Sequence, residues 1–382
     1  MNVRHVVQLI PTIDHIGGAE RQVILLANGL VKRDWQVTVV ALSGTGEDTA
    51  NQLVMAGINY LSLEMGNSLA DPIGWILFHR WLKQTKPEVV HAHLPQAAFL
   101  MRWSRLAAPV RVALNTLHTS STGPIGRVLG YRYSDWLPDK VTAVSNAVAD
   151  SYLSARMVTE RRLTVVPNGV DVKEWQPDPA VRKAVRQELG LADDEFMWFA
   201  AGKLQPVKDY PVLFNAMAEV PGSAQLVIAG GGPLERELRH LADSLGIGER
   251  VRFLGFVPNI QRWMRAADGF VRSSRWEGLP MGLLEASACA VPSVATDVPG
   301  SWAIVVHGQS GFLTSAGDVK ALAAAMTRMM QMPEEERNAM GQLAQRMATE
   351  RYDIDHVLDR WEELYEELLE RNPAPRRWGS KS

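Results

Sequence analysis

Two carboxylates at a fixed separation, Glu277 and Glu285, could do chemistry within the stretch 269–297, GFVRSSRWEGLPMGLLEASACAVPSVATD. The stretch opens with the apolar composition of a buried strand. Pro280 then predicts a helix start, because proline is favoured at the first helical position. The unpaired amides of that helix start, including the amide of Met281, attract phosphate, while carboxylates accept hydrogen bonds from paired hydroxyls. The spacing therefore predicts a site for a phosphorylated ligand such as a nucleotide-sugar, with one carboxylate on each side.

The residues around these carboxylates carry a family signature. Ser273–Pro280, then Glu285-Ala286, then Pro292–Thr296 together resemble the signature of the group 1 glycosyl transferases, glycosyltransferase family 4. The resemblance implies a retaining transferase that uses a nucleotide-activated sugar. It also implies that Glu277 binds the donor sugar, that Glu285 binds the ribose, and that further donor contacts come from Gly278, Leu279, Pro280 and Met281. The alternative is that both glutamates are solvated charges on an ordinary α/β unit.

A double glycine, Gly17-Gly18, follows the strand predicted for residues 3–10 and precedes a predicted helix. Glycine lets the backbone approach a ligand closely, and the free amides of a helix start suit phosphate. The spacing differs from the G-x-G-x-x-G fingerprint of dinucleotide sites, which disfavours a nicotinamide cofactor. The resemblance implies that this loop lies over the donor phosphates. A turn that only packs is the alternative.

Three histidines lie near the ends of predicted strands. His91 and His93 alternate along the strand predicted for residues 88–93, so both rings point to one side near its carboxyl end, which borders the ligand crevice in open parallel sheets. We expect them to bind the acceptor, with structural histidines or a zinc site including His118 as alternatives. His118 also matches the family's histidine near the donor sugar, which implies a catalytic contact. A histidine that only anchors its loop is the alternative.

Lys203 and Lys208 flank a loop that directly follows the strand predicted for residues 197–201. Two fixed cations can neutralise a diphosphate leaving group, so we expect both to bind the donor and to assist catalysis, unless they are solvated loop lysines. The family usually has arginine at position 203, and lysine lacks the planar fork of arginine. Farther along, Gly255-Phe256 ends a strand where the resemblance implies recognition of the base.

The length of 382 residues predicts two domains, and the motif 167–171 closes the first domain in family members. We predict an acceptor-binding domain at residues 1–172 and a nucleotide-sugar-binding domain at residues 173–353. A terminal helix follows at residues 354–371 and a disordered tail at residues 372–382. The resemblance implies an α/β fold of the GT-B type. In that fold two Rossmann-like domains face each other across a deep cleft, and the last helix crosses back to the first domain.

Two positions depart from the family pattern, and one short motif matches a metal-binding pattern. Ala290 stands where the family often has glycine, which removes the easiest left-handed helix terminator and predicts a different helix end. Ala303 stands where a glutamate is usual. The sequence Asp353-Ile354-Asp355 matches a D-x-D pattern used for divalent metals, but it lies at a predicted helix start, where aspartate is a common cap, so we expect no metal site.

Composition excludes several classes of protein. A formal net charge of -2 argues against a general nucleic-acid-binding protein, no apolar run is long enough to span a bilayer, and one cysteine, Cys289, fits a reducing cytoplasm. Residues 1–10 read as a strand and not as a signal peptide. Between residues 72 and 136, basic residues are interspersed with aromatic residues, and the only acidic residues in this segment are Glu88 and Asp135. This predicts either contact with an anionic membrane surface or core aromatics beside solvated charges.

Together these features predict a cytoplasmic retaining glycosyltransferase, peripheral at the inner face of the membrane, that needs no metal or cofactor and uses the nucleotide-sugar as a co-substrate. The expected donor is UDP- or GDP-linked, and the expected acceptor is a lipid-linked or growing saccharide of envelope or exopolysaccharide synthesis in bacteria. Two alternatives stay open: a sugar-nucleotide 2-epimerase, which needs no acceptor, and a non-catalytic nucleotide-sugar-binding protein, which the departures at Ala290 and Ala303 would favour.

Overall fold

The computed structural model describes residues 4–373, apart from residues 15, 16, 45, 66–70, 109, 193 and 223. The chain forms two compact units. The first unit comprises residues 1–167 and 354–382, and the second unit comprises residues 168–353. The division falls after Pro167, a few residues before position 172. Residues 374–382 of the predicted tail lie outside the described residues.

The first unit is built on a parallel sheet of seven strands in the order β3-β2-β1-β4-β5-β6-β7. The strands are β1 (His5–Ile10), β2 (Gln36–Ala41), β3 (Asn59–Ser62), β4 (Val89–His93), β5 (Val112–Leu117), β6 (Lys140–Ala143) and β7 (Leu163–Val165). Every residue of β1, β4 and β5 is buried, because helices cover both faces of a parallel sheet.

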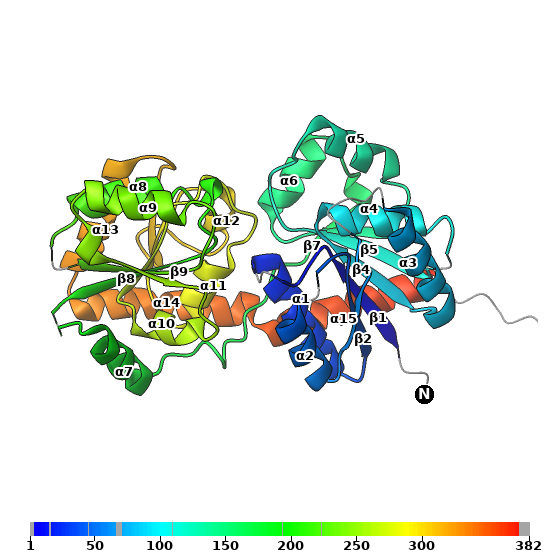
Figure 1. Cartoon of the computed structure of the whole chain (residues 1–382), viewed down its shortest axis with the longest axis horizontal. Coiled ribbons are helices and arrows are strands. Elements are labelled where there is room, and N and C mark those ends of the chain that lie inside the picture. Colours follow the sequence, from blue (N-terminus) through cyan, green and yellow to red (C-terminus); the bar gives the residue numbers. More distant parts are fainter. Residues whose placement is uncertain are drawn as a thin grey trace, which may run out of the picture. The chain divides into compact units, whose positions relative to one another are not determined.

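Helices enclose this sheet on both faces (Figure 1). Right-handed crossovers place α1 and α2 on one face and α3 to α6 on the other. The helices are α1 (Gly18–Val31), α2 (Glu47–Met55), α3 (Pro72–Thr85), α4 (Leu94–Ser104), α5 (Ile125–Ser134), α6 (Asn146–Ser154), the short 3-10 helix η1 (Glu160–Arg162) and the terminal α15 (Ile354–Arg371).

The terminal helix α15 belongs to the first unit, as the expected crossing of the last helix requires, and it lies beside α1 (Figure 1). Its buried residues recur at helical spacing and include Leu358, Trp361 and Tyr365. A Cβ added to Gly29 would lie 2.2 Å from a methyl carbon of Leu358, so glycine lets α1 and α15 approach closely. The indole nitrogen of Trp35 also donates to Glu362 at 2.9 Å. The helix is therefore part of the first hydrophobic core.

The second unit is built on a six-stranded parallel sheet in the order β10-β9-β8-β11-β12-β13. The strands are β8 (Phe196–Ala201), β9 (Ala224–Ala229), β10 (Val251–Gly255), β11 (Gly269–Arg272), β12 (Ser293–Thr296) and β13 (Gly311–Thr314). The core contains aromatic residues such as Trp198 and Phe214 from β8 and α8. Both sheets therefore have the strand order of a Rossmann fold, as predicted.

Helices also cover both faces of the second sheet (Figure 1). They are α7 (Pro179–Leu189), α8 (Tyr210–Glu219), α9 (Glu235–Ser244), α10 (Ile260–Ala266), α11 (Met281–Ala288), α12 (Pro299–Trp302), α13 (Val319–Gln331) and α14 (Glu334–Tyr352), with the 3-10 helices η2 (Pro206–Lys208) and η3 (Gly248–Arg250). Among the described residues, no helix combines the length and the apolar character that crossing a bilayer requires.

The ends of α11 differ from the prediction in two ways. Pro280 is the N-cap, one position before the first helical residue, with extended backbone angles. Ala290 was expected to force a different helix end, and this expectation is wrong, because Ala290 itself adopts the left-handed conformation at φ 55°. The amides of Ala290 and Val291 donate to the carbonyls of Ser287 and Ala286, which is the Schellman pattern that glycine usually completes.

The second departure from the family pattern, Ala303, ends α12, and its carbonyl accepts a 2.6 Å hydrogen bond from Tyr352.

Candidate active site

The predicted donor residues gather where the strand order of the second sheet reverses. β8 and β11 are neighbours, and the loops that follow them are the loop 202–208 and the loop 273–280. In an open α/β sheet, a ligand binds outside the carboxyl ends of the strands at such a switch point. The fold thus brings Lys203 and Lys208 from one loop next to Glu277 from the other.

Glu277 is the best-anchored side chain of this site. One oxygen, Oε1, accepts hydrogen bonds from Lys208 Nζ at 2.8 Å, Arg272 Nε at 2.7 Å and Ser274 Oγ at 2.6 Å. Burial by itself would raise the pKa of Glu277, but the charges of Arg272 and Lys208 outweigh burial and lower the pKa to about 2. Glu277 is therefore an ionised and rigidly held hydrogen-bond acceptor.

Lys208 is a cation held in a partly desolvated place. It ends the 3-10 helix η2, and its side chain is 16% exposed. Burial and, after it, the charge of Arg272 lower the pKa of Lys208 to about 8, although Glu277 acts in the opposite direction. The protonation of this ammonium group therefore changes close to neutral pH.

Arg272 belongs to this site although the sequence did not single it out. It ends β11, and its Nη1 donates to the carbonyl of Ala201 at 2.8 Å. A Cβ added to Gly282 would lie 3.3 Å from the same nitrogen, so the guanidinium lies against the first turn of α11. A charged residue at the carboxyl end of an otherwise apolar strand was the available signal. The family usually has an arginine at position 203, where this chain has lysine. Arg272 provides a guanidinium group next to Glu277 instead.

Lys203 and Glu285 complete the cluster from two other directions. Lys203 is half-buried, and within the described part of the chain no ion pair involves it, but its charge is close enough to contribute to lowering the pKa of Lys208. Glu285 lies in the second turn of α11 and is 3% exposed. Its charge acts on Arg272 and helps to raise the pKa of that guanidinium, after the opposing effect of burial and the larger contribution of Glu277. Three cations and two carboxylates therefore converge on the switch point.

Glycines let the neighbouring loops pack against the Lys203 loop. A Cβ added to Gly230 would lie 2.2 Å from the carbonyl oxygen of Gly202, and one added to Gly232 would lie 2.5 Å from that of Leu204. The amide of Gly230 donates to the carbonyl of Gly255 at 2.8 Å. Phe256 follows with 62% of its surface exposed, next to Gly231. An exposed ring therefore lies beside the glycine loop.

Glu277 is connected to α11 by Gly278, Leu279 and Pro280, and Met281 is the first residue of that helix. Leu279 is buried, and its carbonyl accepts a 3.3 Å hydrogen bond from Asn168. A Cβ added to Gly300 would lie 2.8 Å from the carbonyl oxygen of Gly278. The loop is therefore fixed by backbone packing, and it leads directly into the helix start where the amides of a phosphate site are expected.

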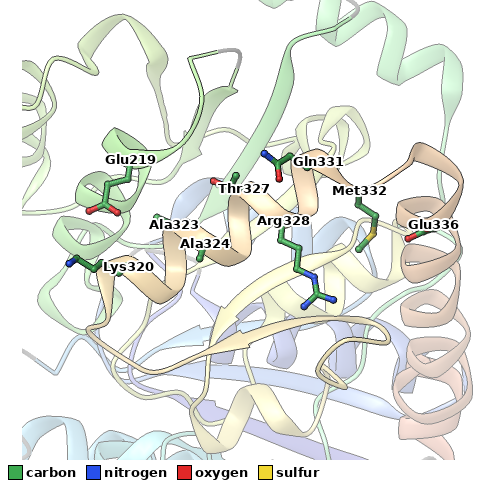
Figure 2. Close-up of a pocket in the computed structure, with 9 residues that line it drawn as sticks. All are labelled: Glu219, Lys320, Ala323, Ala324, Thr327, Arg328, Gln331, Met332 and Glu336. Carbon is green, nitrogen blue, oxygen red and sulfur yellow. The ribbon is translucent and has the colours of Figure 1, made fainter.

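A groove of about 630 Å³ lies elsewhere on the second unit (Figure 2). Its lining residues come from the end of α8, from α13 and its C-cap, and from the start of α14: Glu219, Lys320, Ala323, Ala324, Thr327, Arg328, Gln331, Met332 and Glu336. None of these residues belongs to the loops that follow β8 and β11. The groove therefore has no part in the site formed by Lys208, Arg272 and Glu277.

His91 and His93 of β4 each make two hydrogen bonds to neighbouring side chains. His91 is fully buried, and its ring nitrogens contact Tyr365 Oη at 2.7 Å and Thr116 Oγ1 at 2.6 Å. His91 is therefore a core residue covered by α15, which corrects the expectation that it is presented to an acceptor. His93 is also fully buried, between Gln8 Oε1 at 2.7 Å and His118 Nε2 at 3.0 Å, so the same correction applies to the expectation that it binds the acceptor.

The orientation of the Gln8 side chain determines which ring nitrogens of His93 and His118 carry a proton. The amide nitrogen of Gln8 donates to Tyr365 Oη at 3.3 Å, and its oxygen accepts from His93 Nε2. A neutral His93 then accepts at Nδ1, so His118 must donate from Nε2 and keep a lone pair on Nδ1. Burial lowers the pKa of His118 to about 4, so the ring is neutral near pH 7. Half-buried His118 thus offers an acceptor at the carboxyl end of β5.

The Gly17-Gly18 loop differs in detail from the expectation. Gly17 is the N-cap of α1, and its amide donates to the carboxylate of Glu20 at 2.9 Å. Its amide is therefore not free for phosphate, because the helix's own first turn already uses it.

Within the described residues, no group of three or more His, Cys, Asp or Glu side chains could hold a metal ion.

Comparison with known proteins covers both units. A family profile described as Glycosyltransferase Family 4 matches residues 16–174, and one described as Glycosyl transferases group 1 matches residues 181–347. The chain is 26% identical over 311 residues, 77% of this chain and 79% of the relative, to the UDP-Gal:alpha-D-GlcNAc-diphosphoundecaprenol alpha-1,3-galactosyltransferase of Escherichia coli. It is 29% identical over 317 residues, 75% of this chain and 73% of the relative, to the D-inositol 3-phosphate glycosyltransferase of Xylanimonas cellulosilytica.

Solved structures of similar fold include Anabaena Alr3699/HepE in complex with UDP and glucose, with a TM-score of 0.86, 22% identity, and coverage of 95% of this chain and 100% of that one. The sucrose-phosphate synthase of Thermosynechococcus elongatus matches with a TM-score of 0.84 and 18% identity, covering 96% and 100% of the two chains. These likenesses confirm the GT-B fold. With two profiles spanning both Rossmann-like units and the Glu277 motif in place at the switch point, the chain belongs to glycosyltransferase family 4, the group 1 glycosyl transferases.

Proposed function

We propose that the protein is a retaining glycosyltransferase that moves a sugar from a UDP-linked donor to an acceptor hydroxyl. The observation that carries this proposal is the cluster at the switch point of the second sheet, where Lys208, Arg272 and Ser274 hold one oxygen of Glu277. A fixed carboxylate surrounded by cations suits a ligand that joins a sugar to a diphosphate.

The cations bind and stabilise the leaving group. In the proposed step, the bond between the anomeric carbon and the diphosphate oxygen breaks, and negative charge grows on that oxygen. Lys203, Lys208 and Arg272 lie where they can neutralise this charge, and fixed charges in a partly desolvated site stabilise a developing anion more strongly than water does. The same three charges remove the need for a divalent metal, so we expect chelator to leave the activity unchanged.

Glu277 orients the donor sugar and does not act as the base. A carboxylate with a pKa of about 2 is a weak proton acceptor near neutral pH. In a reaction on one face of the sugar, the acceptor oxygen forms the new bond to the anomeric carbon while its proton passes to the departing phosphate oxygen. This route gives retention and needs no protein nucleophile. Glu277 contributes by accepting hydrogen bonds from sugar hydroxyls.

Two of the similar proteins support UDP as the nucleotide and a lipid-linked saccharide as the acceptor. The Escherichia coli relative is named for UDP-Gal and a diphosphoundecaprenol acceptor, and the HepE structure contains UDP. In this chain, the exposed ring of Phe256 beside Gly231 is available to stack on a base. We place the enzyme in the assembly of a lipid-linked or exported polysaccharide at the cytoplasmic face of the membrane.

A thermal-shift panel with UDP, GDP, ADP and NAD tests the proposed donor. A ligand at about 100 times its dissociation constant stabilises the protein by about 2.7 kcal/mol, which raises the melting temperature measurably. We expect stabilisation by UDP, and a smaller shift for Arg272→Leu than for the matched control Arg346→Leu on α14. Stabilisation by NAD alone, or by none of the four, would contradict the proposal.

A further inference from the structure

Exposed apolar side chains are concentrated on one part of the first unit. Among the described residues, the second unit exposes only three large hydrophobic side chains, Phe256, Trp276 and Trp302. The segment 72–136, from the start of α3 to two residues past α5, exposes many more: Ile73, Ile76, Leu77, Trp103, Leu106, Ile125, Leu129, Tyr133 and Trp136. Several of these are half exposed or more, including Ile73 at 66%, Ile125 at 71% and Trp136 at 61%. A soluble surface rarely gathers so many, and such a patch indicates an interaction site.

These side chains belong to helices that are neighbours on one face of the sheet. α4 contacts both α3 and α5, and Phe99 of α4 packs edge-on against Tyr131 of α5 at 5.0 Å between ring centroids. Figure 1 shows α3, α4 and α5 together on the side of the sheet away from α1 and α2. The inner aromatics, such as Phe78 and Tyr131, are core, whereas Trp103, Tyr133 and Trp136 point outward. We call this set of exposed side chains, on α3, α4 and α5 and within two residues after α4 and α5, the apolar face.

The charged residues within the three helices that carry the apolar face are all basic. No acidic residue occurs within α3, α4 or α5, whereas Arg80 and Lys83 are exposed on α3 and Arg132 is exposed on α5. The flanking acids are committed to the fold, because Asp71 caps α3 at 2.9 Å and buried Asp135 accepts two hydrogen bonds from Thr159. The face therefore presents apolar side chains and cations without a compensating carboxylate on these helices.

We propose that the apolar face binds the surface of an anionic bilayer. Aliphatic side chains such as Ile73 and Ile125 would enter the acyl boundary, Trp136 and Tyr133 would lie at the headgroup level, and Arg80 and Lys83 would meet lipid phosphates. The occupant is a bilayer because exposed cations beside exposed aliphatic and aromatic side chains, spread over three neighbouring helices, match an anionic surface in charge. The inference rests on the lipid-linked acceptor of the proposed function, since a protein held at the membrane surface meets such an acceptor there.

Co-sedimentation of the full chain with lipid vesicles tests this face without any sugar transfer. The probes are vesicles of phosphatidylcholine alone and vesicles of equal parts phosphatidylcholine and phosphatidylglycerol. We expect binding to the anionic vesicles, weaker binding to the neutral ones, and weaker binding as salt rises, because the Debye length shrinks. Each Lys or Arg near an anionic surface contributes about fivefold in affinity, so R80Q together with K83Q reduces binding about 25-fold.

A matched pair of apolar variants separates this face from general stickiness. Ile73→Ser with Ile125→Ser removes two exposed side chains from the apolar face and reduces binding at least tenfold. Val54→Ser with Met55→Ser removes two from α2 on the other side of the sheet, where they are 59% and 88% exposed, and leaves binding unchanged. All of these side chains are on the surface, so the melting temperature should not move. Absence of wild-type binding to anionic vesicles, or equal losses in both pairs, overturns the inference, whereas failure of donor binding alone bears only on the proposed function.

Discussion

The pKa of Lys208 makes donor binding depend on pH in a way that can be calculated. Burial and the charge of Arg272 lower this pKa to about 8 in the free protein. A diphosphate beside the ammonium group would raise it, so UDP binds the protonated form more tightly, and binding takes up a proton as pH rises through 8. The protonated fraction falls from about nine-tenths at about pH 7 to about one-tenth at about pH 9, which predicts a dissociation constant about tenfold larger at the higher pH.

Isothermal titration of UDP between about pH 7 and pH 9 measures this effect, since the terminal phosphate of UDP has a pKa of about 6 and is mostly ionised across the window. Lys208→Arg keeps the charge but cannot lose its proton, so its dissociation constant should stay constant across the window. Lys203→Arg keeps Lys208 and should show the same tenfold change as the wild type. A wild-type affinity that is independent of pH, or an equal slope in Lys208→Arg, would refute the role assigned to Lys208.

Three further perturbations test separate parts of the structure. Arg272→Leu removes one of the two cations on Glu277 Oε1 and should weaken UDP binding about tenfold or more in calorimetry, whereas the exposed control Arg346→Leu should not. Ala290→Gly relieves a left-handed alanine and should raise the free energy of unfolding by about 1 kcal/mol in urea titrations; a loss of stability would contradict the strain inferred from φ 55°. Gln8→Leu removes the acceptor for His93 Nε2, so nitrogen NMR of the imidazoles should show a mixture of tautomers for His118. In the wild type the proton of His118 should be on Nε2, and a wild-type proton on Nδ1 would contradict the assignment.

The sequence predicted the fold because its signals are local and repeated. Apolar runs such as β1 and β5 alternate with amphipathic helices such as α15, and this alternation is what two parallel sheets with covered faces require. Residues that directly follow a strand, such as Lys203 after β8, were also predictable as site candidates, because strand ends meet at one edge of the sheet.

The features that the sequence did not predict depend on contacts between distant segments. His91 was expected near an acceptor, but Tyr365 covers it from 274 residues away along the chain, and no local pattern at His91 signals that helix. Arg272 was missed because its role depends on Glu277 and on the first turn of α11, which only the folded loop brings together. Ala290 was misjudged because the close packing of Gly341, whose added Cβ would lie 2.0 Å from the Ala290 carbonyl, holds the helix end in place despite the strain.

The anomeric configuration of the product tests the central claim most directly. The purified chain is incubated with an α-linked UDP-sugar and a lipid-linked saccharide acceptor, and mass spectrometry with proton NMR follows donor, product and UDP. The account predicts an α-linked product with release of one UDP for each sugar transferred, and a loss of turnover of about a hundredfold in Glu277→Gln but not in the exposed control Glu237→Gln. A β-linked product, a donor that is isomerised without an acceptor, or undiminished turnover in Glu277→Gln would contradict it.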